Sequence, residues 1–268
     1  MTADQNIMYA IVDALGLPPG ARVDARVPKK LLVEQGTPTS ADRRAVQDGI
    51  DELQWFAACK PTTIGVPSFT DDTREYLEIA VVGCVFRSGA QAGRIVELIH
   101  RAIPYPVLLV TADERGVTMS AAHKRRAQNE ANKVVVDRIV ATGSIDPAPL
   151  GDNEKAFLDS LALAEQPRRD LFRLYEGWLT KIEALNAAQL TGSFSVSSDE
   201  KVIERRRAAI DEFGRLLRES THLRSQAAKA RQISHRVDLN QRIKSIEAAM
   251  DEARRVILGG SHENIDHS

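Results

Sequence analysis

The first half of the chain contains residues of the types that a Mg²⁺-dependent nuclease uses: Asp71, Asp72, Glu78 and Lys60. Such an enzyme needs an acid on one strand, and an acid with a nearby lysine on the next, to hold the metal beside a base. The run Glu78-Ile79-Ala80 lacks that lysine, so Lys60 would have to reach the site from a neighbouring segment. The alternative, which we favour, places the acids in a hairpin loop and Glu78 at a sheet edge or in a salt bridge.

Other catalytic signatures are missing from the sequence. It contains no GxxxxGK[ST] and no GxGxxG for a nucleotide, and CxxC, HExxH and GxSxG are absent too. The glycines of residues 87–93 open an expected helix, but no lysine follows them to hold a phosphate. Cys59 and Cys84 lie in apolar runs, which predicts buried, inert thiols. Outside the C-terminal tail no histidines lie at metal-ligand spacing, so we expect no metal site and no cofactor.

Clustered basic residues suggest contact with a nucleic acid. Residues 205–244 contain 11 basic and 4 acidic side chains, a local charge of +7 in a chain whose net charge is −1. Arginines on a helix can follow phosphates, whereas the alternative is the ordinary charged exterior of a helix pair. A second basic run follows a predicted strand, where charge can equally prevent edge-to-edge pairing. The candidate contacts are Arg205, Arg206, Arg224, Lys229, Arg231, Arg236, Lys124, Arg125 and Arg126.

The elements that would position these residues change character along the chain. Residues 1–146 alternate between helical and strand-like patterns, which predicts a mixed α/β domain with a sheet of about four to six strands. The strongest strand signal is residues 76–86, which are nearly continuously apolar and are therefore expected at the centre of the sheet. Helices are expected at 41–53 and 90–102, and residues 107–121 are typical of a β-hairpin.

After a linker that contains two prolines, the pattern becomes entirely helical. Residues 199–258 contain no proline, and their apolar residues keep heptad spacing on both sides of a slip in register at 223–237. Such a slip indicates either a stutter or a bend between two antiparallel helices. We therefore predict an α+β protein: a mixed α/β sheet domain over 1–146, an all-helical coiled-coil arm over 150–258, and a disordered tail over 259–268.

The composition limits the class of protein. Of the 268 residues, 43% are hydrophobic and 27% are charged, so the chain can bury a core and is neither disordered nor a disulfide scaffold. There is no run of 18 or more apolar residues, and the first residues lack the basic character of a signal peptide. The two cysteines suit a reducing compartment, so we expect a cytoplasmic protein with no membrane contact.

Five segments, in order, resemble a bacterial family known as domain of unknown function 4391. They are similar to the family patterns I-P-K-x-x-F, I-x-x-I-x-W followed by K-L and T-I-N, E-I-x-V-F, A-I-P-Y-x-x-L-F and K-E-K-Q-x-N-R-x-V-E-L-N. The matching segments in this chain are 27–31, 50–64, 77–79, 102–109 and 227–240. Ala230 and Ser234 depart from the pattern, because the family tends to have Glu and Asn there.

The resemblance implies a context rather than an activity, because family members look like accessory proteins beside helicases and DNA methyltransferases in restriction-like antiphage defence loci. It also draws attention to Lys29, Tyr105 and Asn240, of which Asn240 would fix register if it lay at a helix–helix seam. We expect a non-catalytic accessory or adaptor subunit that docks a helicase or methyltransferase and contacts DNA through its basic arm. The alternatives are a divergent Mg²⁺-dependent nuclease and a purely structural homodimer through the coiled coil.

Overall fold

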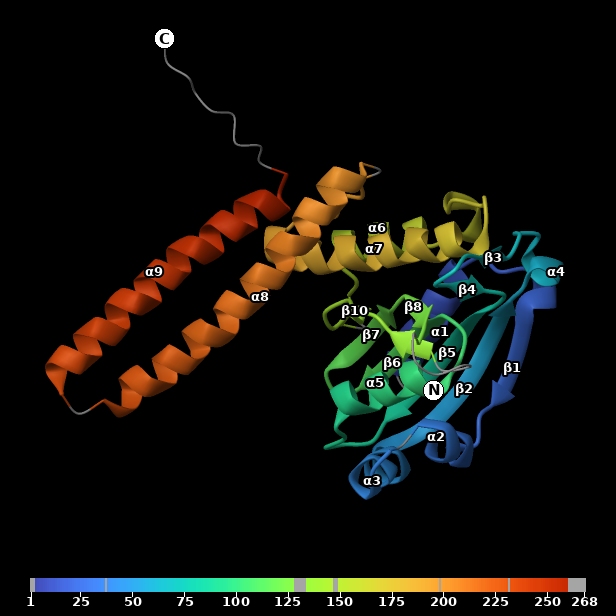
Figure 1. Cartoon of the computed structure of the whole chain (residues 1–268), viewed down its shortest axis with the longest axis horizontal. Helices are drawn as coiled ribbons and strands as arrows, with labels where there is room; N and C mark the ends of the chain where they lie inside the picture. The colour runs from blue at the N-terminus through green and yellow to red at the C-terminus, as the bar shows by residue number, and fades with distance from the viewer. Residues whose placement is uncertain are drawn as a thin grey trace, which may run out of the picture. The chain divides into compact units, whose positions relative to one another are not determined.

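The chain folds into two compact units, residues 1–186 and 187–268, in the computed structural model (Figure 1). The structure describes residues 3–36, 38–127, 134–146, 149–197, 199–230 and 232–259. The first unit is built on a mixed β-sheet, and the second contains the C-terminal helices. The chain is therefore a mixed α+β protein, as its alternating and then helical patterns predict.

The main sheet has six strands in the order β1-β2-β5-β6-β7-β10. Their bounds are Arg22–Arg26 (β1), Ile50–Cys59 (β2), Ile79–Phe86 (β5), Val107–Asp113 (β6), Gly116–Ala121 (β7) and Val140–Ala141 (β10). Strands β5 and β6 are parallel, and the other neighbouring pairs are antiparallel. A parallel pair needs a long crossover, which helix α5 (Ala92–Ala102) supplies here.

Helices cover the sheet. In the first unit they are α1 (Ala3–Ala14), α2 (Lys29–Gly36), α3 (Ser40–Gly49), α4 (Pro61–Ile64), α5, α6 (Asp152–Ser160) and most of α7 (Leu171–Thr191), with short 3₁₀ turns η1 (Pro19–Ala21) and η2 (Leu163–Glu165). Helices α2, α3 and α5 pack in one apolar cluster against Val82 and its neighbours. The next residue, Gly83, faces the opposite way, toward Phe56 and Met8 of α1.

The strand predicted at 76–86 is confirmed over 79–86 as β5, which lies inside the sheet between β2 and β6, whereas Tyr76 belongs to a separate strand, β4 (Glu75–Tyr76). The helix predicted at 41–53 is wrong in its last turn, because α3 ends at Gly49 and β2 begins at once. Ile50 and Leu53 are buried in the sheet. Their apolar contacts there outweigh the helical periodicity of the segment, as tertiary packing commonly does.

Two small ribbons lie beside the main sheet: β3 (Phe69–Thr70) with β4 (Glu75–Tyr76), and β8 (Lys124–Arg126) with β9 (Val134–Val136). An aromatic cluster joins them to α7. The ring centroid of Phe172 lies 5.2 Å from that of Tyr76 and 5.1 Å from that of His123. The Tyr76 hydroxyl and His123 Nδ1 are 2.6 Å apart.

Residues 150–186, which the sequence assigns to the helical arm, belong to the compact unit of the sheet. The Tyr175 hydroxyl donates to the carbonyl oxygen of Val107 at 2.8 Å, and Trp178 Nε1 donates to that of Leu161 at 2.8 Å. Both aromatic side chains are fully buried. The division between the units therefore lies later than the expected start of the arm, because the apolar face of α7 packs into the first unit.

The second unit is a helical hairpin of α8 (Glu200–Lys229) and α9 (Ile233–Ile257), with the end of α7 beside it (Figure 1). The two helices are antiparallel, since Arg224 pairs with Glu247 while Arg206 Nε donates to the carbonyl oxygen of Ile257. The slip in register at 223–237 is therefore a bend. Two apolar clusters line the seam, one containing Leu223, Leu239 and Ile243, the other Ala187, Ala209, Phe213, Ala253 and Ile257.

Helix α9 ends at Ile257, next to the predicted end of the arm. Apart from Gly259, the tail predicted to be disordered lies outside the described residues. None of the helices that the structure describes is long and apolar enough to cross a membrane.

Candidate functional site

The nuclease candidates Lys60 and Glu78 form an ion pair. Cys59, at the end of β2, faces Ile79, at the start of β5, so the two flanking residues meet with Nζ 3.1 Å from Oε2. The Glu78 side chain is 9% exposed and that of Lys60 is 49% exposed. An ion pair is one of the two structural roles that we expect for Glu78.

The other two nuclease candidates have different surroundings. Asp71 Oδ1 accepts hydrogen bonds from the backbone N–H groups of Thr73 (2.7 Å) and Arg74 (2.6 Å), which close its own turn and lower its pKa. Asp72 is exposed. Throughout the described ranges, no three His, Cys, Asp or Glu side chains are grouped so that they could hold a metal ion. Glu78 already has Lys60 as its partner, so this carboxylate has a structural role that needs no metal ion.

Two lysines that the sequence singles out hold backbone carbonyl groups. Lys29 Nζ donates to the carbonyl oxygen of Ile50, which ties the start of α2 to the start of β2. Lys124 Nζ donates to the carbonyl oxygens of Ile103 and Tyr105, just after α5 ends. Because Lys124 is only 3% exposed, the prediction that it contacts a nucleic acid is wrong, and its role here is structural.

A buried histidine lies close enough to Lys124 to be affected by its charge. His100 Nε2 is 3.1 Å from Ser120 Oγ, and Nδ1 has no hydrogen-bond partner among the described residues. Burial, assisted by the positive charge of Lys124, lowers the pKa of His100 to about 3. Burial also lowers the pKa of Lys124 to about 7. Such shifts are common at active sites, but these side chains are enclosed, so we interpret them as a buried structural network.

The remaining residues of the second basic run are exposed and paired with carboxylates. Arg125 Nε lies 3.4 Å from Asp137 Oδ1, and Arg126 Nη2 lies 3.0 Å from Glu75 Oε1. Exposed ion pairs contribute little to stability, but each carboxylate reduces the positive potential around its arginine. This run is therefore a weaker candidate for phosphate contact than an unpaired cluster would be.

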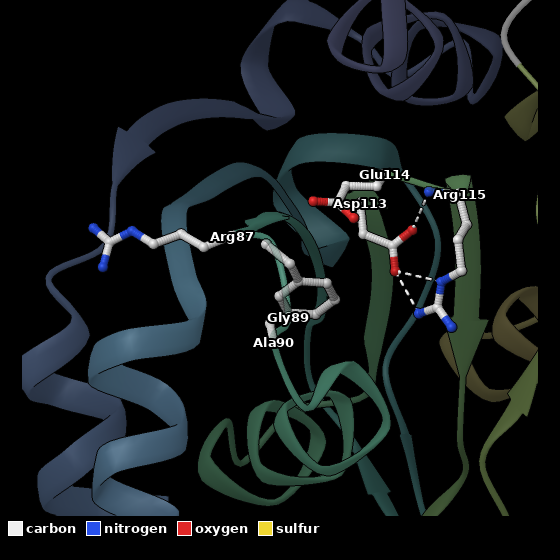
Figure 2. Close-up of a pocket in the computed structure, with 7 residues that line it drawn as sticks. Arg87, Gly89, Ala90, Asp113, Glu114 and Arg115 are labelled. Carbon is white, nitrogen blue, oxygen red and sulfur yellow. Dashed lines mark hydrogen bonds and ion pairs between the residues drawn. The ribbon is translucent and has the colours of Figure 1, made fainter.

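A pocket of about 250 Å³ opens where the parallel strands β5 and β6 end (Figure 2). Ligands of α/β sheets commonly bind at this end. Figure 2 shows Arg115 turned onto Asp113, with Nη2 2.5 Å from Oδ2, and Arg87 directed away from both. Glu114 adds a second carboxylate to the lining. Two carboxylates disfavour a phosphate, so the glycine loop that borders this pocket, which includes Gly89, is not suited to that ligand.

Some basic side chains of the helical hairpin already have partners. Arg206 Nη1 donates to the carbonyl oxygen of Ser195 at 2.7 Å. Arg224 Nη2 lies 2.7 Å from Glu247 Oε1 on the facing helix. These two side chains therefore already have partners in the second unit, whereas Arg205 is exposed near the start of α8.

Four exposed basic residues lie on the hairpin between the end of α8 and the middle of α9, and we call them the tip cations: Lys229, Arg236, Arg242 and Lys244. Among the described residues of the hairpin, none of the four lies within ion-pair distance of a carboxylate. Arg231, a further candidate in this turn, lies outside the described residues. The tip thus carries positive charge that nearby acids do not compensate, as contact with a polyanion requires.

The family position Asn240 does not lie at the helix–helix seam. It is exposed, whereas Leu239 and Ile243 are buried against α8. The interpretation of Asn240 as a buried residue that fixes register is therefore wrong. Its helical spacing instead places it on the outward face that carries Arg236 and Lys244.

A family model described as "Domain of unknown function (DUF4391)" matches residues 15–250. The chain belongs to the DUF4391 family. No curated protein and no solved structure matches it. The DUF4391 match covers the sheet and most of the helical hairpin, so it confirms the resemblance carried by the five segments, and it brings no activity with it.

Sequence reasoning missed one charged contact that organises this DUF4391 chain. Arg94 Nε and Nη2 donate to the two carboxylate oxygens of Asp42 at 2.7 and 3.0 Å, which joins α3 to α5. Hydrogen bonds from Arg94 lower the pKa of Asp42 to about 2. The two residues are 52 positions apart, so no local spacing could have indicated the pair.

Proposed function

We propose that this chain is a non-catalytic accessory subunit of a bacterial restriction-like antiphage defence system. In this proposal it acts in the cytoplasm, docks a helicase or DNA methyltransferase, and contacts DNA through the tip of its helical hairpin. The defence context and the class of partner rest on the resemblance to domain of unknown function 4391. The DNA contact rests on the tip cations.

The observation that carries the proposal is the set of four tip cations. Arg206, Arg224 and Arg255 are occupied by carbonyl or carboxylate groups, whereas the tip cations are exposed and unpaired in the described structure. Four like charges, with Asp238 as the one acid between Lys229 and Lys244 in the sequence, disfavour the isolated protein. Phosphates would neutralise these charges and release counterions, so DNA is a favourable partner for this surface.

We also propose that α8 and α9 form a two-stranded antiparallel coiled coil. Apolar residues recur on α9 at intervals of three and four from Leu239 to Ile257, and several are buried in the seam. Such packing would hold the turn end of the hairpin rigid. It would therefore present the tip cations to DNA at little cost in conformational entropy.

The test is binding of the full chain to fluorescently labelled duplex and single-stranded DNA, measured by anisotropy in the presence of Mg²⁺. We expect the double reversal Arg236→Glu/Lys244→Glu to weaken binding by at least about tenfold, since each phosphate contact contributes close to a factor of ten near 0.1 M salt. The matched control is Arg43→Glu/Arg44→Glu, which makes the same charge change at two exposed residues of α3.

The control should bind as the unmodified chain does. An equal loss in both variants would mean that only net charge matters, and it would contradict a DNA surface at the tip. Shortened DNA products that disappear in Glu78→Ala would instead support the nuclease alternative.

A further inference from the structure

The most exposed large apolar side chain among the described residues stands at the hairpin tip. Ile233 is the first residue of α9 and is 71% exposed. Val237, one helical turn later, is 47% exposed. Exposed aliphatic residues placed singly need no explanation, but these two are adjacent on the helix surface and lie beside exposed cations.

The two aliphatic side chains share one face of α9 with polar and basic ones. Ile233, Arg236, Val237, Asn240 and Lys244 follow each other at intervals of three, one, three and four residues, which keeps them on the same side of a helix. The seam residues Leu239 and Ile243 lie on the adjoining side of α9, about 100° around the helix axis, and all five residues of this face are exposed. This face, which we call the tip face, is therefore turned outward along its whole length.

Charge decides which kind of partner fits the tip face. The charged side chains of the tip face are Arg236 and Lys244, and both are basic. Such a surface repels a second copy of itself and attracts a polyanion. A nucleic acid offers a partner for both kinds of side chain on this face. The cations can bind phosphate groups, and an aliphatic side chain between them can pack against the flat faces of the bases.

We propose that the tip is a wedge: Ile233, supported by Val237, inserts between neighbouring base pairs of duplex DNA while the flanking cations hold the phosphates. This inference rests on the DNA binding proposed above and names the form of DNA that the tip recognises. Insertion must separate two stacked bases, and a duplex with a bulged base has already lost part of that stacking. The chain should therefore bind a bulged duplex in preference to an intact one.

The experiment uses the full chain and two duplexes of equal length and sequence, one with a single unpaired base, each carrying 2-aminopurine at the same step. We expect binding to the bulged duplex to be about tenfold tighter, which corresponds to about 1.4 kcal/mol. We also expect binding to raise 2-aminopurine fluorescence, because the base loses its stacking. Ile233→Ser should abolish both effects while its affinity for the intact duplex stays within about twofold of the unmodified value.

The control variant is Leu217→Ser, which removes an exposed aliphatic side chain of α8 that is 46% exposed. It should keep both the preference and the fluorescence change. If the chain binds DNA without the preference for the bulged duplex and without the fluorescence change, the wedge is wrong. It is also wrong if both effects persist in Ile233→Ser. In either case the proposal that the tip binds DNA would still stand. Failure of the unmodified chain to bind either duplex would overturn the wedge and the proposed function together.

Discussion

At the scale of single residues, Lys124 is buried, and no described residue places a carboxylate within ion-pair distance of its Nζ. Its Nζ donates to two carbonyl oxygens just beyond the end of α5, and a neutral amine has enough hydrogens for both bonds. Because no counter-charge is present at these carbonyls, burial lowers the pKa of Lys124 to about 7. Near neutral pH, therefore, Lys124 loses its proton in the folded chain, whereas it stays fully protonated in the unfolded chain.

This shift predicts a pH-dependent stability of the first unit. The pKa of Lys124 is lower in the folded state than the ordinary value of 10.5, so the unfolded state binds more protons above pH 7. The free energy of unfolding should therefore rise from pH 7 to 8.5, by up to about 1.4 kcal/mol per pH unit. Urea unfolding followed by tryptophan fluorescence measures it, since both tryptophans lie in the first unit.

Lys124→Met should remove this rise and lower stability at every pH by about 1–3 kcal/mol, because two buried carbonyl groups lose their donor. The exposed Lys155→Met on α6 serves as the control and should keep the rise. A Lys124→Met variant with the same dependence on pH as the unmodified chain would show that another group titrates.

At the scale of the elements, Gly83 lets α1 approach the sheet. A methyl group added there would collide with the Phe56 ring and would lie 2.8 Å from Met8 Sδ. Gly83→Ala should therefore destabilise the first unit by about 1–3 kcal/mol, as overpacking of a close-packed core does. Gly93→Ala in α5, where the added methyl group meets nothing within 4 Å, should be neutral or stabilising by up to about 1 kcal/mol.

Thermal unfolding of these two variants by circular dichroism measures the contrast. Equal melting temperatures for Gly83→Ala and Gly93→Ala would mean that α1 does not press against β5 at this position.

The elements that could be predicted are those in which one local pattern decides the structure. The hairpin at 107–121 is confirmed as β6 and β7, because apolar strands flank a polar turn. The end of α3 could not be predicted, since Ile50 fits a helical stripe and only the neighbouring strand favours β2. The structural role of Lys124 in the candidate site could not be predicted either. In the sequence it belongs to a basic run with Arg125, whereas the carbonyl oxygens that accept its hydrogen bonds come from residues about 20 positions earlier.

At the scale of the whole molecule, the chain consists of a sheet unit and a unit that contains the helical hairpin. Contact of the hairpin with DNA and docking of a larger partner are both predictions. A purely structural homodimer through the hairpin remains the alternative. It would give a molecular mass that rises with concentration, independently of DNA.

The most direct measurement of the central claim is the salt dependence of DNA binding. The logarithm of the association constant should fall linearly with the logarithm of the salt concentration, by about 0.9 for each phosphate contacted. We expect Arg236→Gln/Lys244→Gln to make this slope shallower by about 1.8, the value for two lost contacts. The control Arg43→Gln/Arg44→Gln should give the same slope as the unmodified chain. Equal slopes for the unmodified chain and both variants would contradict the claim that the hairpin tip contacts DNA.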